Sequence, residues 1–163
     1  GIDPQAAAGL ELEITESLIM DSVRRSIASL HAIRAMGVTI AIDDFGTGFS
    51  SLSYLARLPV DTLKIDRTFI TGMTTGPQGL SLVSTIINLA RSLKLKVVAE
   101  GVETEEQSKA LQELGVNTLQ GYLFARPAGP DEIRSVLAEL GVAGVDDEPP
   151  TNWSSTMAAL LHS

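Results

Sequence analysis

Strand-like apolar stretches alternate with helix-like stretches five times along this chain of 163 residues. The first stretch, residues 10–15, alternates apolar and polar residues with a period of two, and residues 38–45 form a nearly continuous apolar run. Three more strands are predicted at residues 62–66, 96–102 and 118–124. Apolar strands that each precede an amphipathic helix predict parallel strands buried on both faces.

A helix is predicted after each strand. Asp21 is the expected cap of the first helix, whose apolar residues recur every three or four positions up to Gly37. The remaining helices are predicted near residues 51–58, 79–93, 105–114 and 130–140, with Thr104 as the cap of the fourth helix and a Gly/Pro-rich loop before the third. Five consecutive βα units indicate the α/β class, either a parallel barrel or an open sheet.

Composition narrows the possible partners. The chain has 12 basic and 20 acidic residues, a net charge of -8, which argues against binding a nucleic acid polymer. A phosphate ligand would therefore need the help of a metal. No apolar run is long enough to cross a bilayer, so we expect no membrane contact by this segment. The hydrophobic fraction of 44% suggests that part of the apolar surface packs against something else.

Polar residues stand at or near the carboxyl end of each predicted strand. They are Glu13, Asp43 with Asp44, Lys64, Glu100 and Gln120. The carboxyl ends of parallel strands meet on one rim, where α/β proteins build their active sites. The alternative, that each is an ordinary cap or turn residue, would have to hold at all five strand ends. The pattern therefore favours a site.

Carboxylates with one lysine and one amide, without a His or Cys cluster, favour Mg²⁺ or Mn²⁺ over zinc. The two histidines, His31 and His162, are not placed to join them. Two such ions suit hydrolysis of a phosphodiester. Lys64 would then orient the attacking hydroxide or offset charge on the phosphate, unless it is a solvated lysine at a strand end. Glu100 is either a general base or another metal ligand.

Ordered motifs give the chain a resemblance to one family. They are Glu13-Ile14-Thr15-Glu16, Asp43-Asp44-Phe45-Gly46-Thr47-Gly48, Lys64-Ile65-Asp66, Ala99-Glu100-Gly101-Val102-Glu103 and Gln120-Gly121-Tyr122-Leu123-Phe124. Over residues 10–141 the chain resembles the EAL domain, the bacterial cyclic di-GMP phosphodiesterase. The resemblance implies a (β/α)8 TIM-like barrel that hydrolyses cyclic di-GMP to linear pGpG with two Mg²⁺ or Mn²⁺ ions. The partner it implies is cyclic di-GMP, a cytoplasmic messenger, so we expect a cytoplasmic location.

The resemblance also implies roles for single residues. Glu13 would be a metal ligand, Asp43 the carboxylate shared by both metals, and Asp44 a ligand of the second metal. Lys64 would hold the attacking water, and Glu100 would be the general base or a metal ligand. Gln120 would complete the network of metal and water.

Other residues have less specific roles in this resemblance. Glu16 would anchor the glycine-rich loop after Asp44, which also takes part in dimerisation, and Glu103 would lie near the substrate or second metal. Both could instead be helix-start carboxylates favoured by the helix dipole. A guanine pocket could be lined by Tyr122, Phe124 and Pro127, although apolar residues at a strand end are more often part of the core.

The chain also departs from the family pattern. A glutamate and an asparagine that bind metal in the family are expected well upstream of Glu13, where only 12 residues are present. We therefore expect an incomplete barrel of about five βα units, with exposed edges, weak metal binding, little or no turnover, and self-association into a homo-oligomer. Residues 1–9 are expected to be a lead-in and residues 142–163 a linker and tail, in which residues 153–161 would be disordered or a short docking helix.

Other functions remain possible for such a chain. It could bind cyclic di-GMP without cleaving it, although such sensors usually lose motif carboxylates. It could serve only as a dimerisation module, which the expected incomplete barrel favours. A hydrolase of another phosphodiester would fit the carboxylates but not the ordered motifs.

Overall fold

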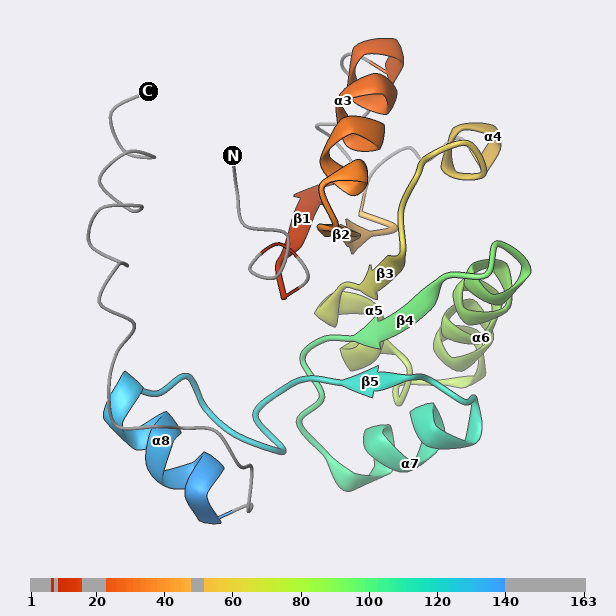
Figure 1. Ribbon diagram of the computed structural model, residues 1–163. Helices are drawn as coiled ribbons and strands as arrows, with labels where there is room; N and C mark the ends of the chain where they lie inside the picture. Colours follow the sequence, from red (N-terminus) through yellow and green to blue (C-terminus); the bar gives the residue numbers. More distant parts are fainter. Residues whose placement is uncertain (1–6, 8, 16–22, 48–51, 140–163) are drawn as a thin grey trace. The chain divides into compact units, whose positions relative to one another are not determined.

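The computed structural model describes residues 7, 9–15, 23–47 and 52–139. The chain forms two compact units, Gly1–Ala125 and Arg126–Ser163. The first contains a five-stranded sheet with helices α3 to α7, and the second contains helix α8, Pro130–Glu139 (Figure 1). The predicted cap Asp21, the predicted loop anchor Glu16 and the tail after residue 141 lie outside the described residues.

The sheet is parallel, and its strands follow one another in chain order. Their bounds are β1 Glu11–Thr15, β2 Thr39–Phe45, β3 Thr62–Ile65, β4 Lys96–Ala99 and β5 Thr118–Leu119. The α/β class and the five consecutive units are thus confirmed. Strands β4 and β5 are shorter than predicted, because the backbone turns away at Gly101, where φ is +68°, and at Gly121. Among the described strands, β1 and β5 form the two edges of the sheet.

The helices connect successive strands. Their bounds are α3 Val23–Ala35, α4 Leu52–Leu55, α5 Arg67–Gly72, α6 Pro77–Ser92 and α7 Glu105–Glu113. Helix α5 corrects the expectation of a loop before α6: Asp66 accepts a hydrogen bond from Thr68 N at 3.0 Å, and Ile70 is fully buried. Helix α7 has the predicted cap, because Thr104 and Gln107 form a reciprocal capping box. No helix in the described ranges is both long and apolar enough to span a membrane.

One face of the sheet carries the apolar core. The pairing of Ile42 with Leu63, and of Leu63 with Val97, aligns buried side chains across three strands. Helices α3, α6 and α7 cover this face with Leu30, Val83, Ile86, Ile87, Ala90 and Leu111. Because side chains alternate along a strand, the intervening residues Glu13, Thr62 and Lys64 point to the opposite face. That opposite face carries the candidate site.

The prediction that the strands are buried on both faces is wrong for strand β1. None of its five residues is buried, and Leu12 keeps 37% of its surface exposed. Leu10, just before the strand, is 49% exposed. Part of the apolar content of the chain is therefore exposed, as leucines at this edge of the sheet.

Candidate active site

Lys64 on β3 is the centre of the predicted polar cluster. Its side chain is only 7% exposed, and its Nζ lies 2.6 Å from Glu13 Oε1, 2.7 Å from Glu100 Oε1 and 3.1 Å from Asp43 Oδ1. The alternative of a solvated lysine at a strand end is therefore wrong. Four of the residues selected from four different strand ends are in direct contact.

Strand register explains this convergence. Glu13 pairs with Ala41, Ala41 pairs with Thr62, and Lys64 pairs with Val98, so all of these side chains point to the same face. Asp43 lies two residues after Ala41 and shares that direction. Glu100 follows β4, where its backbone N–H donates to Ile65 O at 3.1 Å and keeps it beside β3. Strands β1 and β2, on one side of β3, and the end of β4, on the other side, thus direct carboxylates at the ammonium of Lys64.

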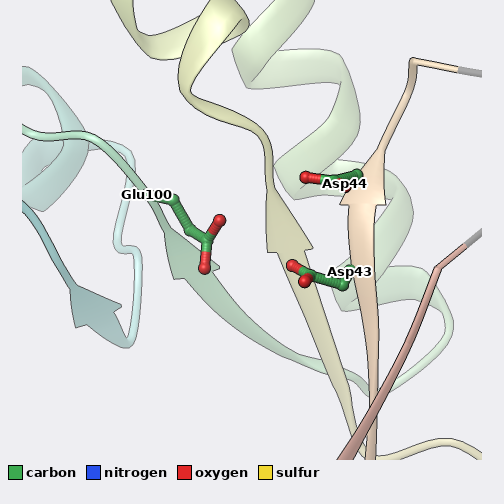
Figure 2. Close-up of side chains that lie close together, drawn as sticks. All are labelled: Asp43, Asp44 and Glu100. Carbon is green, nitrogen blue, oxygen red and sulfur yellow. The ribbon is translucent and has the colours of Figure 1, made fainter.

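A bulge near the end of β2 presents both aspartates together. Ile42 pairs with Leu63 but Phe45 pairs with Ile65, so β2 contains one extra residue in this interval. Asp44 has a φ of +52°, a left-handed conformation that Asp tolerates better than most residues. Such a bulge re-aims a side chain that regular alternation would send to the other face. Figure 2 shows that Asp43 and Asp44 both point toward the side on which Glu100 lies.

Asp43, Asp44 and Glu100 fit a divalent cation. One carboxylate oxygen from each lies within 4.8 Å of the others, and all three side chains are half-buried (Figure 2). Asp43 Oδ1 is buried and accepts no directed hydrogen bond from a described residue, although the ammonium of Lys64 is close. An all-oxygen set with an unsatisfied buried acceptor is suited to a hard divalent cation. Glu13, the fourth predicted ligand, is not part of this group of three, and its carboxylate forms an ion pair with Lys64.

Charge shifts the pKa values in this cluster. Burial alone would lower the pKa of Lys64, but the close carboxylates of Glu100, Glu13 and Asp43 outweigh it and raise that pKa well above its usual range. Burial and the neighbouring charges of Asp43 and Asp66 raise the pKa of Asp44. A charged lysine and crowded carboxylates therefore share the site, an arrangement that a divalent cation would relieve.

A cavity of about 370 Å³ opens beside the cluster. Its walls are made by the ends of β2, β3, β4 and β5. The lining residues are Asp44, Asp66, Arg67, Glu100, Gly101, Glu103, Gln120, Gly121 and Tyr122. The structure thus places the predicted residues Gln120 and Glu103 at one cavity with Asp44 and Glu100.

Asp66 and Arg67 line this cavity but were not selected from the sequence as site residues. A signal was available for Asp66, since it stands two residues after Lys64 and just beyond the strand, on the same face. Burial alone would raise the pKa of Asp66, but hydrogen bonds from the Thr68 hydroxyl and backbone hold it below its usual value. Arg67 carried no such signal, because a residue that begins a helix is normally solvated.

None of the three residues suggested for a guanine pocket is buried. Tyr122 is 53% exposed and Phe124 55% exposed, so the alternative that they are core residues is wrong. Of these two, Tyr122 lines the cavity beside the cluster. Pro127 is an exposed residue of the second unit.

Comparison with known proteins identifies the relatives. The family model of the EAL domain matches residues 3–127. The cyclic di-GMP phosphodiesterase NbdA of Pseudomonas aeruginosa is 49% identical over 122 residues, which are 75% of this chain and 16% of NbdA. MucR of the same organism, a bifunctional diguanylate cyclase and cyclic di-GMP phosphodiesterase, is 50% identical over 129 residues, 79% of this chain and 19% of MucR.

Solved structures agree with these matches. The c-di-GMP complex of the PaMucR phosphodiesterase superposes with a TM-score of 0.75 at 50% identity, over 78% of this chain and 51% of that chain. The manganese/cy-diGMP complex of Klebsiella pneumoniae BlrP1 superposes with a TM-score of 0.70 at 34% identity, over 78% of this chain and 32% of that chain. The matched part of this chain thus corresponds to about half of the chain solved for MucR. On its motifs, its fold and these matches, the chain belongs to the EAL domain family.

Proposed function

We propose that this chain supplies most of the cation and substrate site of a cyclic di-GMP phosphodiesterase, which hydrolyses the cyclic dinucleotide to pGpG. The observation that carries the proposal is the convergence of Glu13, Asp43 and Glu100 on the buried Lys64. The relatives NbdA and MucR are named for this activity, and structures of MucR and BlrP1 contain the cyclic dinucleotide. A cytoplasmic messenger as substrate would place the site in the cytoplasm.

The proposed ligands of Mg²⁺ or Mn²⁺ are Glu13, Asp43, Asp44 and Glu100, with Asp43 shared. When bound, two such ions would activate water and neutralise charge on the phosphodiester. Lys64 is fixed by three carboxylates and would use its Nζ to hold the attacking water in line with the phosphorus. Glu100 touches Lys64 and would accept the proton of that water.

The remaining proposed roles belong to the cavity beside the cluster. Gln120 and Glu103 line it and would contact water or substrate. Gln120 is fixed through its backbone, which donates to Ala99 O at 2.9 Å and accepts from Val102 N at 3.0 Å. Glu16 is proposed to anchor the loop that follows Asp44.

Product formation tests this function. The chain is incubated at high concentration with cyclic di-GMP and excess Mg²⁺ or Mn²⁺, and pGpG is quantified by chromatography. We expect slow formation of pGpG, since this chain covers 51% of the MucR structure and the resemblance implies two further metal ligands. Chelation should abolish the product.

Two variants make the test specific. Glu100→Gln removes the proposed base and should lower the rate about 100-fold or more. Asp131→Asn is the matched control, because the Asp131 side chain is 98% exposed on α8, and its rate should equal that of the parent. Binding of cyclic di-GMP without product would contradict the hydrolase and favour a sensor. Neither binding nor product would favour a purely structural module.

A further inference from the structure

The cavity beside the cluster has one cationic side chain in its wall. Among its described lining residues, Asp44, Asp66, Glu100 and Glu103 are acidic, and Arg67 is the sole basic residue. Lys64 is not one of these lining residues, and it is buried and already engaged with three carboxylates. Any negative charge on a ligand that lies away from the metal ligands therefore has Arg67 as its available counter-charge.

Arg67 also lines a second cavity. This one has a volume of about 580 Å³, and its wall includes Arg67, Gly101 and Glu103 together with the threonines Thr68 and Thr71 on α5. Arg67, Gly101 and Glu103 belong to both cavities. Arg67 is thus located where a ligand that extends from the first cavity into the second would pass.

The first carbon atoms of the Arg67 side chain are packed against the backbone, whereas its guanidinium can bind a ligand. A Cβ atom on Gly101 would lie only 2.4 Å from Arg67 Cβ, so the glycine backbone packs directly against this side chain. Gly101 has a φ of +68°, which also disfavours any larger residue there. Within the described part of the chain, the guanidinium makes neither an ion pair nor a hydrogen bond, and the residue is exposed.

We infer that Arg67 binds the second phosphodiester of cyclic di-GMP, the one that is not cleaved. The inference rests on the proposed function. Cyclic di-GMP carries two phosphodiester anions, and only one of them can lie beside the metal ligands at a time. The other anion must be accommodated in a wall that is otherwise acidic, where a planar guanidinium with two parallel N–H donors suits a phosphate. Arg67 would therefore act in substrate binding rather than in bond cleavage.

Binding titrations of the full chain test this role. The dissociation constants of cyclic di-GMP and cyclic di-AMP are measured with Mn²⁺, over a time in which turnover is negligible. Arg67→Ala keeps the Cβ atom that packs on Gly101, so the fold should persist, as checked by circular dichroism and the urea midpoint. We expect Arg67→Ala to weaken the binding of cyclic di-GMP about 10- to 100-fold.

Further variants separate charge from shape. Arg67→Lys keeps the positive charge but lacks the two parallel N–H donors, and it should lose less affinity than Arg67→Ala. Arg57→Ala removes another exposed arginine, between α4 and β3, and should bind like the parent. Because both dinucleotides have the same two phosphodiesters, Arg67→Ala should weaken both by a similar factor.

Three results would overturn the inference. Unchanged affinity of Arg67→Ala, with binding by the parent intact, would reject Arg67 while leaving the proposed function in place. A loss confined to cyclic di-GMP would mean that Arg67 contacts the guanine edge and not the phosphate. A parent chain that binds neither dinucleotide would contradict the proposed function itself, and the role of Arg67 with it.

Discussion

The buried ammonium of Lys64 is the residue on which the site depends. Three carboxylates surround it within 3.1 Å, and with Asp44 the cluster contains four formal negative charges against one positive charge. A lysine buried to this extent is tolerated because its partners replace the water it has lost. Conversely, without Lys64 the carboxylates would repel one another in a poorly solvated place.

Replacing Lys64 with Met should therefore destabilise the fold as well as the chemistry. We expect a loss of about 3–5 kcal/mol in the free energy of unfolding, measured with urea, because the carboxylates lose their counter-charge. Added Mn²⁺ should recover part of this loss in the variant. Lys109→Met, at an exposed position on α7, should remain within about 0.5 kcal/mol of the parent. Equal stability of the two variants would show that the carboxylates do not need Lys64.

Asp66 gives a pH-dependent prediction. Hydrogen bonds from Thr68 lower the pKa of Asp66 in the folded chain, so folding favours the ionised form. The stabilisation is thus complete above the unfolded pKa of about 3.9 and is lost as the pH falls through the lower folded value. Asp66→Ala should cost about 1 kcal/mol at pH 7, as a lost helix cap does. The difference from the parent in urea unfolding should shrink below about pH 4, and a difference independent of pH would refute this cap.

At the scale of the elements, the turns after β4 and β5 determine where Glu100 and Gln120 lie. Gly101 packs on Arg67, and Gly121 packs on the backbone of Val102. These contacts bring the two strand ends together, since Val102 N also donates to Gln120 O. The geometry of these two turns therefore determines the positions of Glu100 and Gln120 in the site.

Gly121→Ala should move this turn. An added Cβ would lie 2.2 Å from Val102 O and 2.3 Å from Val102 N, so the backbone must shift. We expect a cost of about 1–3 kcal/mol in unfolding free energy and weaker cyclic di-GMP binding through displacement of Gln120. Gly129→Ala is the control, because its Cβ would meet nothing within 4 Å. If both variants matched the parent, the close packing at Gly121 would be unimportant.

The order of elements could be predicted from the sequence because each strand and most helices have strong apolar patterns. Helix α5 could not, because its six residues lie beside a Gly/Pro-rich segment and depend on Asp66 and on burial of Ile70. Strand β5 was predicted too long, since the apolar residues after Gly121 resemble a strand although the backbone has already turned. Local pattern identifies an element, whereas tertiary contacts determine where it ends.

The candidate site, like the order of the elements, could be predicted from the sequence only in part. Parallel topology alone brings strand ends together, so the convergence of Glu13, Asp43, Lys64 and Glu100 could be predicted from the sequence. The bulge in β2 was not predicted, because a one-residue insertion depends on the register with β3 and leaves no pattern in β2 itself. Arg67 was missed since its relevance comes only from two cavities that meet at it.

At the scale of the whole molecule, the uncovered edge of the sheet predicts self-association. Strand β1 has a neighbour on one side among the described strands, and Leu10 and Leu12 are exposed beside it. An edge of this kind tends to pair with another chain. Light scattering at micromolar concentration should give a mass above that of one chain of 17.3 kDa, and Leu12→Lys should lower it. A monodisperse monomer would contradict this prediction.

A calorimetric titration with Mn²⁺ would show whether the strand ends around Lys64 form a site for a divalent cation. We expect saturable binding by the parent chain, binding by Asp131→Asn at the same affinity, and loss of binding in Asp43→Asn, whose buried carboxylate oxygen lacks a directed hydrogen bond. Binding by Asp43→Asn as tight as that of the parent would show that the cation is held elsewhere and not at these strand ends.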